Sequence, residues 1–207
     1  MEEKEQTKEK AARGKRMAKS AAREICYTAM FVAIITVCAW ISIPIGEIPI
    51  TLQTMGVCLA AALLGWKRGA IATAVYILLG LCGVPVFTGF TGGVAKLVLP
   101  TGGYIVGFLF TALIVGAASD YIKIKNVLAR MAVLAAAMAV GIAVCYAFGT
   151  AWFMALYARA EKSITLAGAL SLCVVPYLLP DLVKVIFAAA LEVGGQAVLG
   201  RQCATST

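Results

Sequence analysis

The 207-residue chain contains no histidine, and this absence excludes several kinds of active site. Without histidine there is no H-E-x-x-H zinc motif, and the commonest metal ligand and the usual general base are both missing. The sequence also lacks a G-x-x-x-x-G-K-[ST] phosphate loop, and its apolar part carries no paired carboxylates. We therefore expect no metal site, no ATP site, no bound cofactor and no catalytic residues in this chain.

Disulfide and redox motifs are absent as well. The seven cysteines, at positions 26, 38, 58, 82, 145, 173 and 203, form no C-x-x-C pair and follow no regular spacing. We interpret them as small apolar packing residues, which is the usual role of an unpaired buried cysteine.

Charge is scarce. Only 14% of the residues are charged, whereas 62% are hydrophobic and the mean hydropathy is +0.93. A soluble domain is roughly 45–50% apolar and about 25% charged. The long Leu-, Ala- and Val-rich runs do not alternate as the strands of a membrane barrel do, and lipid admits only helices or closed barrels. The composition therefore predicts an all-α integral membrane protein.

Apolar runs predict six transmembrane helices. Residues 1–23 hold eight of the 18 Lys and Arg residues and are interpreted as a basic cytoplasmic tail, followed by a membrane domain over 24–200 and a short tail over 201–207. Two of the runs are short for a bilayer of about 30 Å, which takes about 20 residues of straight helix to cross. The predicted spans are residues 25–45, 51–64, 70–81, 104–118, 127–156, and a last segment over 166–199 in which Pro180 begins the sixth helix.

The basic residues predict the orientation of these spans. With the N-terminus inside, 14 Lys and Arg residues fall on the cytoplasmic side and only Lys96, Arg159, Lys162 and Lys184 fall outside. This asymmetry follows the positive-inside rule and places both termini in the cytoplasm. The Gly-rich residues 83–103 and the start of the last helix then share the outer side.

Residues 176–184 carry the most unusual charges in the sequence. Asp181 and Lys184 stand three residues apart in an otherwise apolar segment, where ionisable groups are costly unless something uses them. Asp181 follows Pro180 in the predicted first helical turn, where free N–H groups favour a carboxylate. One interpretation is a local ion pair at the membrane interface. The other is a site for a zwitterion, or for a ligand with an amide-like end and an acid end.

Further polar and aromatic residues fall on the same predicted side. Gln53, preceded by Thr51, offers two donors and an acceptor that complement an amide or a urea, although both residues equally suit a helix start. Residues 83–103 are apolar but interrupted by Gly and Pro, which predicts a structured loop at the membrane edge. That loop either packs as a re-entrant segment or brings backbone close to a ligand, with Phe87 and Tyr104 as apolar walls.

Five segments together resemble the BioY family, the biotin-specific substrate-binding (S) components of energy-coupling factor (ECF) transporters. The resemblance covers about residues 25–199, and one departure is Leu99, where the family tends to have glycine. The segments, in the family's order, are Ile48-Pro-Ile-Thr-Leu-Gln-Thr54, Gly65-x-Lys-Arg-Gly69, Gly83-Val-Pro-Val-Phe87, Pro100-Thr-Gly-Gly-Tyr104 and Pro180-Asp-Leu-Val-Lys184.

The resemblance implies a six-helix S-component fold in the cell membrane that captures biotin near the outer face and is not an enzyme. It implies partnership with a transmembrane coupling protein (EcfT) and two cytoplasmic ATPases, which are the only subunits that use ATP. Ala29 and Ala33 match the Ala-x-x-x-Ala element by which S components dock on the coupling protein.

The same resemblance assigns roles to the candidate site residues. Asp181 would accept hydrogen bonds from the ureido N–H groups of biotin, and Lys184 would either bind the carboxylate or orient Asp181; the sequence leaves both roles of Lys184 open. The remaining predicted ligand-binding residues are Thr51, Gln53, Phe87, Gly93, Tyr104 and Tyr177.

Three other functions are compatible with parts of this pattern. They are a stand-alone biotin facilitator that works without ATPases, an S component for another vitamin, and an intramembrane enzyme with Asp181 and Lys184 as acid and base. The enzyme is disfavoured because no Ser or Cys stands beside a recognisable base.

Overall fold

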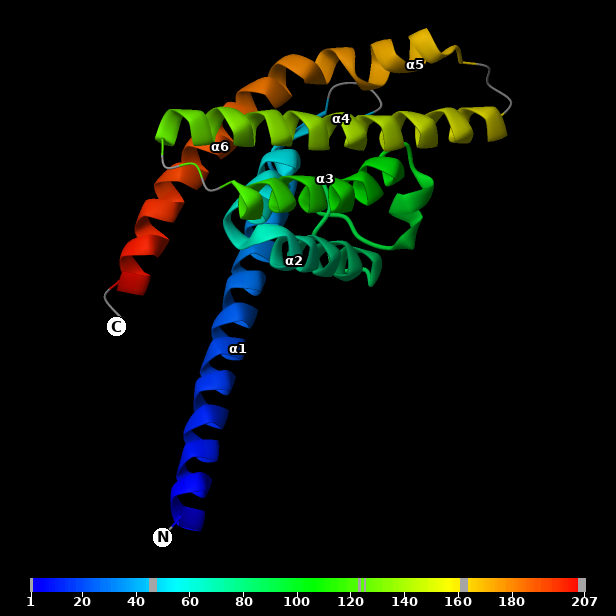
Figure 1. Ribbon diagram of the computed structural model, residues 1–207. Coiled ribbons are helices and arrows are strands. Elements are labelled where there is room, and N and C mark those ends of the chain that lie inside the picture. The colour runs from blue at the N-terminus through cyan, green and yellow to red at the C-terminus, as the bar shows by residue number, and fades with distance from the viewer. Residues whose placement is uncertain (1, 45–47, 123, 125, 161–163, 205–207) are drawn as a thin grey trace.

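The computed structural model describes residues 2–44, 48–122, 124, 126–160 and 164–204, with backbone alone at 2–5, 7–16, 19–20 and 196–204. This part of the chain is a bundle of helices (Figure 1), which confirms the all-α prediction. The helices and strands, in chain order, are α1 (Glu2–Trp40), β1 (Ser42–Ile43), β2 (Ile50–Thr51), α2 (Gln53–Leu81), the 3₁₀ helix η1 (Val94–Val98), α3 (Gly102–Tyr121), α4 (Val127–Arg159), α5 (Leu166–Cys173) and α6 (Val175–Ala204).

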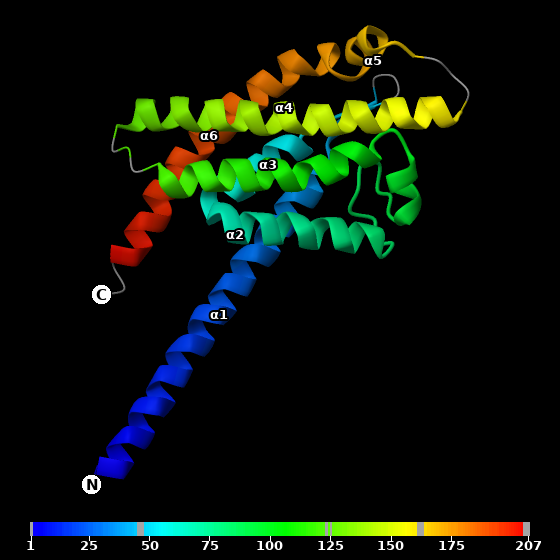
Figure 2. The same ribbon diagram turned by 45° about the vertical axis from the view of Figure 1, so that its right-hand side comes forward.

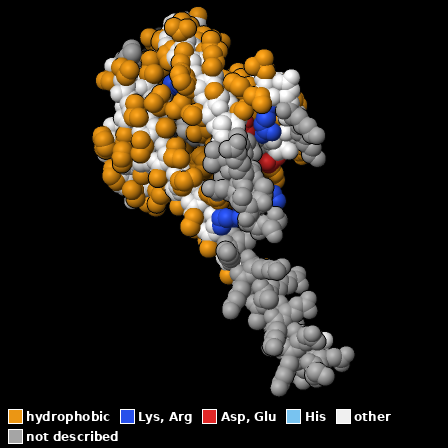
Figure 3. Space-filling model, turned by 90° about the vertical axis from the view of Figure 1, so that its left-hand side faces the viewer, with side chains coloured by type: hydrophobic (Ala, Val, Ile, Leu, Met, Phe, Trp, Pro, Cys, Tyr) orange, Lys and Arg blue, Asp and Glu red, His pale blue; other side chains and the backbone are white. Residues whose placement is uncertain are grey.

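The bundle buries many small residues among its larger core side chains, and it presents many other large apolar residues outward. Ala60, Ala61, Ala72, Ala112 and Ala188 are fully buried. Hydrophobic side chains cover most of the bundle face seen in Figure 3, where few charged side chains are visible. This arrangement suits a lipid surrounding, because lipid tails give no reason to hide Leu or Phe and small residues let helices approach closely.

The helix α2 is broken at Gly65, where the backbone takes φ 79° and ψ 179°. Its two halves correspond to the second and third predicted spans. The end of α3 binds both sides of the break, since Ser119 Oγ donates to the Ala62 carbonyl at 2.6 Å and the Trp66 N–H donates to Asp120 Oδ2 at 3.0 Å. The break is therefore a built feature of the fold, with the exposed backbone groups satisfied by α3.

The start of the last helix differs from the prediction. The helix α6 begins at Val175, and Pro180 lies inside it rather than in its first turn. The bend lies at Val174, where α5 and α6 meet at 42°. Pro176 lies in the first turn of α6, where a backbone N–H has no partner within the helix, so its missing N–H does not weaken the helix. Pro180 follows one turn later, inside the helix.

The number of membrane spans stays a prediction. Within the described residues four helices are long and apolar enough to cross a membrane, or five if the bent pair α5 and α6 counts as one span. Counting the two halves of α2 separately gives the six predicted segments. The helix α1 ends at Trp40, five residues before the predicted boundary, because the chain turns there into the β1–β2 pair.

The connections gather at two opposite ends of the bundle. The break in α2, the end of α3, the start of α4 and the C-terminal part of α6 lie at one end, whereas residues 82–101, the end of α4 and the start of α5 lie at the other (Figures 1 and 2). At the first end Arg68 pairs with Glu24 at 2.6 Å, and Arg130 pairs with the fully buried Glu192 at 2.7 Å. Arg68 and Arg130, which were predicted on the cytoplasmic side, thus lie away from residues 82–101, whereas Lys123 and Lys125 fall outside the described residues.

Candidate functional site

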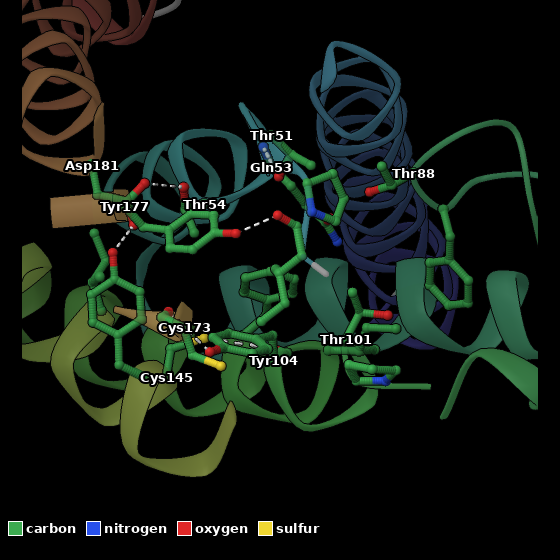
Figure 4. Close-up of a pocket in the computed structure, with 18 of the residues that line it drawn as sticks. Thr51, Gln53, Thr54, Thr88, Thr101, Tyr104, Cys145, Cys173, Tyr177 and Asp181 are labelled. Atoms are coloured by element: carbon green, nitrogen blue, oxygen red, sulfur yellow. Dashed lines mark hydrogen bonds between the residues drawn. The ribbon is translucent and has the colours of Figure 1, made fainter. Parts of the chain in front are cut away.

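A cavity of about 360 Å³ lies at the end of the bundle formed by residues 82–101. This volume is within the range of small-molecule sites. Its walls come from residues 48–51, α2, the loop between α2 and α3, α3, α4, the end of α5 and α6 (Figure 4). Seven of the eight predicted ligand-binding residues line it: Thr51, Gln53, Phe87, Tyr104, Tyr177, Asp181 and Lys184.

Gly93 is the predicted site residue that does not line the cavity. It precedes η1 with φ 98°, and its N–H donates to the Gly80 carbonyl at 2.7 Å. Its role in the structure is therefore to tie the loop to the second half of α2.

Asp181 is the most heavily bonded polar group of the cavity. Lys184 Nζ donates to its Oδ1 at 2.6 Å, and Thr54 Oγ1 donates to the same oxygen at 3.4 Å. The Tyr146 hydroxyl donates to Oδ2. The side chains of Asp181 and Lys184 are each only 8% exposed. The carboxylate is thus held by side chains from three helices, and it stands beyond the first turn of α6, so free N–H groups at the helix start do not stabilise it.

The two interpretations of the Asp181–Lys184 pair prove compatible. The residues form a local i,i+3 ion pair, and the pair also faces the cavity. Because the two charges cancel, the pair offers a ligand hydrogen-bonding groups of both kinds without a net charge.

Gln53 connects the cavity to the loop. Its side chain is nearly buried, and Nε2 donates to the Tyr76 hydroxyl at 2.9 Å, which in turn donates to the Val86 carbonyl at 3.1 Å. Thr51 Oγ1 accepts from the Gln53 N–H at 3.3 Å, so Thr51 also serves the helix start. The position of Gln53 is therefore fixed by the same contacts that hold Phe87 at the cavity wall.

Aromatic contacts hold the loop against the bundle. Phe87 packs edge-on against Tyr76 with ring centroids 5.6 Å apart. On the outer side Trp40 stacks on Phe90 at 4.7 Å and donates from Nε1 to the Pro85 carbonyl at 3.0 Å. The predicted structured loop is present, and Leu99 fits it without glycine because its φ of −84° is open to any residue.

Two tyrosines form the cavity wall and also join elements to one another. The Tyr104 hydroxyl donates to the Cys173 carbonyl at 3.2 Å, and its ring fills the place that a side chain at position 149 would need, which explains Gly149. The Tyr177 hydroxyl donates to the Ile48 carbonyl. With their hydroxyls bound to backbone, both residues present mainly ring surface to a ligand.

Five residues with a hydroxyl or ammonium group that line the cavity were missed in the sequence, namely Thr54, Thr88, Lys96, Thr101 and Tyr146. Thr54 follows Gln53 directly, and Lys96 was one of the few basic residues predicted outside, so both carried a signal. Tyr146 carried none, because one hydroxyl within a long apolar helix does not show which way it faces.

The predicted docking residues lie away from the cavity. Ala29 and Ala33 are exposed on α1, whereas Phe31, Val32 and Ile35 turn into the core. The small residues thus face outward, where another helix has room to approach.

This chain is similar to members of a known protein family. The BioY family model matches residues 7–201, which reaches into the segment 1–23 and beyond the 25–199 of the resemblance. The biotin transporter BioY of Thermotoga maritima is 37% identical over 169 residues, covering 82% of this chain and 93% of the relative. The biotin transporter BioY of Rhizobium etli is 35% identical over 183 residues, covering 86% of this chain and 93% of the relative.

A solved structure shares the fold. The crystal structure of the S-component for biotin from an ECF-type ABC transporter has a TM-score of 0.75 and 28% sequence identity to this chain. The match covers 86% of this chain and 93% of that one.

Proposed function

The chain belongs to the BioY family, and from this premise we propose that it is the S component of an ECF-type transporter, capturing biotin in the cavity beside Asp181 for uptake across the cell membrane. The proposal rests on one observation. In a single cavity, the Asp181–Lys184 ion pair, whose two charges cancel, faces apolar and aromatic walls. Biotin has the matching parts, namely a polar ureido ring, an apolar thioether ring and a carboxylated tail.

The Asp181 cluster supplies the groups that a ureido ring needs. The carboxylate accepts N–H bonds, while Lys184, whose ammonium has three N–H donors and gives one of them to Asp181, can donate to a ureido oxygen. Each hydrogen bond to a charged group contributes roughly 1.5–3 kcal/mol, so a few of them in a dry cavity support tight binding. The rings of Phe87, Tyr104 and Tyr177 provide apolar surface for the rest of the ligand.

The energy for uptake comes from other subunits in this proposal. The sequence carries no phosphate-binding loop, so the proposed partners are a transmembrane coupling protein and two ATPases that alone use ATP. The exposed Ala29 and Ala33 of α1 are the proposed docking face, and the whole S component would tilt against the coupling protein during the cycle.

A binding screen tests the ligand. Purified protein in detergent is incubated with labelled biotin, thiamine, riboflavin and lipoate, and bound label is measured at equilibrium. We expect saturable binding of biotin alone. Exclusive binding of another vitamin would assign the chain to a different substrate and end the biotin proposal.

An uptake assay separates the S component from a stand-alone facilitator. Vesicles containing this chain alone are compared with vesicles that also contain the coupling protein and ATPases, with ATP inside. We expect binding in both and ATP-dependent accumulation in the second only. Full uptake by the chain alone would make it a facilitator.

A further inference from the structure

The helix α1 continues well past the part that is apolar enough to cross a membrane. It runs from Glu2 to Trp40, whereas the candidate span covers only Ala21–Trp40. Its N-terminal half projects beyond the rest of the bundle (Figures 1 and 2). Residues 2–20 carry seven Lys and Arg residues and four Glu residues, so the projecting part has an excess of positive charge.

This positive charge recurs at a helical spacing. Positions three, four or seven residues apart return to the same side of an α-helix. Four lysines follow this spacing and are called the basic stripe below: Lys4, Lys8, Lys15 and Lys19. No acidic residue lies between Lys10 and Arg23, so the charge of the stripe is least compensated at Lys15 and Lys19.

The basic stripe lies in register with the outward face of α1. The same spacing leads from Lys19 through Cys26 to Ala29, Ala33 and Val37, and the structure exposes all four of these later residues. Because α1 is one continuous helix, the stripe and the proposed docking face are two parts of one surface. The first part lies beyond the candidate span and the second lies within it.

The opposite register of α1 leads toward the bundle. Lys10 and Arg13 are in register with Glu24 and Phe31, of which Phe31 is buried. Glu24 forms an ion pair with Arg68 of α2 at 2.6 Å. The acidic residue nearest to Lys15 and Lys19 on the bundle side is thus turned toward α2 and is already paired.

Resting on the proposed function, we infer that the basic stripe extends the docking face beyond the membrane and binds an acidic surface of the coupling protein. Small residues at Ala29 and Ala33 let a partner helix approach closely within the membrane. Lysines in the same register then meet that partner outside it, where opposite charges steer association and fix register. The stripe therefore selects the partner, whereas the alanines provide the packing.

The length of the stripe favours a protein over lipid headgroups. At 1.5 Å per residue, Lys8 lies about 20 Å along α1 from Ala21, where the candidate span begins. In physiological salt, charges act over only about 8 Å. Headgroups at the membrane surface would reach the stripe only near its Lys19 end, whereas a protein packed along α1 would follow it outward.

Two double variants test the inference with the same change of charge on different sides of one helix. Lys15→Glu with Lys19→Glu reverses the stripe, and Lys10→Glu with Arg13→Glu is the matched control in the opposite register. The Kd of each purified protein for the purified coupling protein–ATPase complex is measured in detergent, free of added lipid, at about 0.1 M and about 0.5 M salt. Biotin binding is measured in parallel and reports whether each variant is folded.

We expect the stripe variant to bind the complex about 5- to 30-fold more weakly at the lower salt, because two exposed charge pairs are lost and reversed. High salt should remove most of this difference. The control should stay within about 3-fold of wild type, and biotin binding should be unchanged in both. If the Glu variant does not fold, Lys15→Gln with Lys19→Gln replaces it.

Equal Kd values of the two double variants for the complex would overturn the inference, because the effect would then depend on total charge and not on the face of α1. Equal loss of uptake by both variants in phosphatidylglycerol vesicles, but not in phosphatidylcholine vesicles, would assign the stripe to lipid instead. A wild-type protein that binds biotin but never the complex would refute the docking part of the proposed function, and one that binds no biotin would refute its ligand.

Discussion

At the scale of single residues, the site is organised by how one carboxylate is held. Asp181 accepts hydrogen bonds from Thr54, Tyr146 and Lys184, which belong to α2, α4 and α6. A buried carboxylate is costly unless it is paired and hydrogen-bonded. Lys184 is three residues away in the chain, whereas Thr54 and Tyr146 come from distant parts of the sequence. The cluster therefore holds α2, α4 and α6 together, and it does so at the place where the ligand is proposed to bind.

Tyr146→Phe should weaken biotin binding by about 10- to 100-fold, because it removes the hydroxyl that donates to Asp181 and holds this carboxylate in place, while it keeps the ring. Equilibrium binding to the purified variant measures the loss. Tyr121→Phe is the matched control, since Tyr121 is 83% exposed at the end of α3. Equal affinities of Tyr146→Phe and wild type would place the ligand away from the Asp181 cluster.

Asp181→Asn should reduce both stability and binding. It leaves the Lys184 ammonium buried without its counter-charge, and breaking a buried pair costs about 3–5 kcal/mol of unfolding free energy. Adding Lys184→Gln should restore much of the stability but not the binding. Thermal unfolding in detergent and biotin binding are measured on both variants; a double variant that binds biotin normally would contradict the assigned role of Asp181.

Sequence reasoning found the residues that stand out from their surroundings. Asp181 and Lys184 interrupt an apolar segment, and Phe87 and Tyr104 flank a Gly- and Pro-rich loop, so composition alone exposed them. Thr54 and Tyr146 are ordinary in apolar helices, and their contact with Asp181 depends on how α2, α4 and α6 cross. No pattern within one helix contains that information.

At the scale of elements, the break in α2 shows how the fold places the cavity. The first half of α2 carries Gln53 and Thr54, and the second half carries Tyr76, which holds the loop. The short apolar runs and Gly65 predicted two segments, but the capping by Ser119 and Asp120 was invisible in the sequence. Likewise, the two prolines predicted that the last helix begins near Pro180, whereas α6 begins at Val175 with Pro176 in its first turn, and the backbone bends at Val174.

Gly65→Ala should destabilise the fold. The φ 79°, ψ 179° region is almost exclusive to glycine and costs another residue about 1–3 kcal/mol, and an added Cβ would also displace the Asp120 carboxylate. We expect the Tm in detergent to fall by roughly 4–8 °C. Gly194→Ala is the control, because nothing lies within 4 Å of that position in α6 and alanine favours a helix. Equal Tm values for Gly65→Ala and wild type would show that the break needs no glycine.

At the scale of the whole molecule, binding and docking occupy different surfaces. The cavity lies at the end formed by residues 82–101, while Ala29 and Ala33 lie on the outside of α1. Trp40 connects them, since it ends α1 and contacts Phe90 and Pro85 of the loop. A partner bound along α1 therefore contacts the helix that also braces the cavity loop.

Replacing Ala29 and Ala33 by Trp should spare biotin binding and abolish uptake with partners, because bulky side chains keep another helix at a distance. The chain contains its own control: Ala132 and Ala136 form the same small-x-x-x-small pair, exposed on α4. Trp at those positions should leave uptake unchanged. Accumulation of labelled biotin in vesicles measures both variants, and normal uptake by the α1 variant would move the docking face elsewhere.

The charge balance of the cavity has an electrical consequence. Asp181, Lys184 and Lys96 line the cavity and sum to one positive charge when it is empty, and a bound biotin monoanion would bring that sum to zero. Moving one elementary charge through 100 mV amounts to about 2.3 kcal/mol. In the proposed tilting cycle the membrane voltage therefore leaves the loaded inward step nearly untouched. It opposes the outward return of the empty protein by up to that amount, so the work against the membrane voltage is done in this return step.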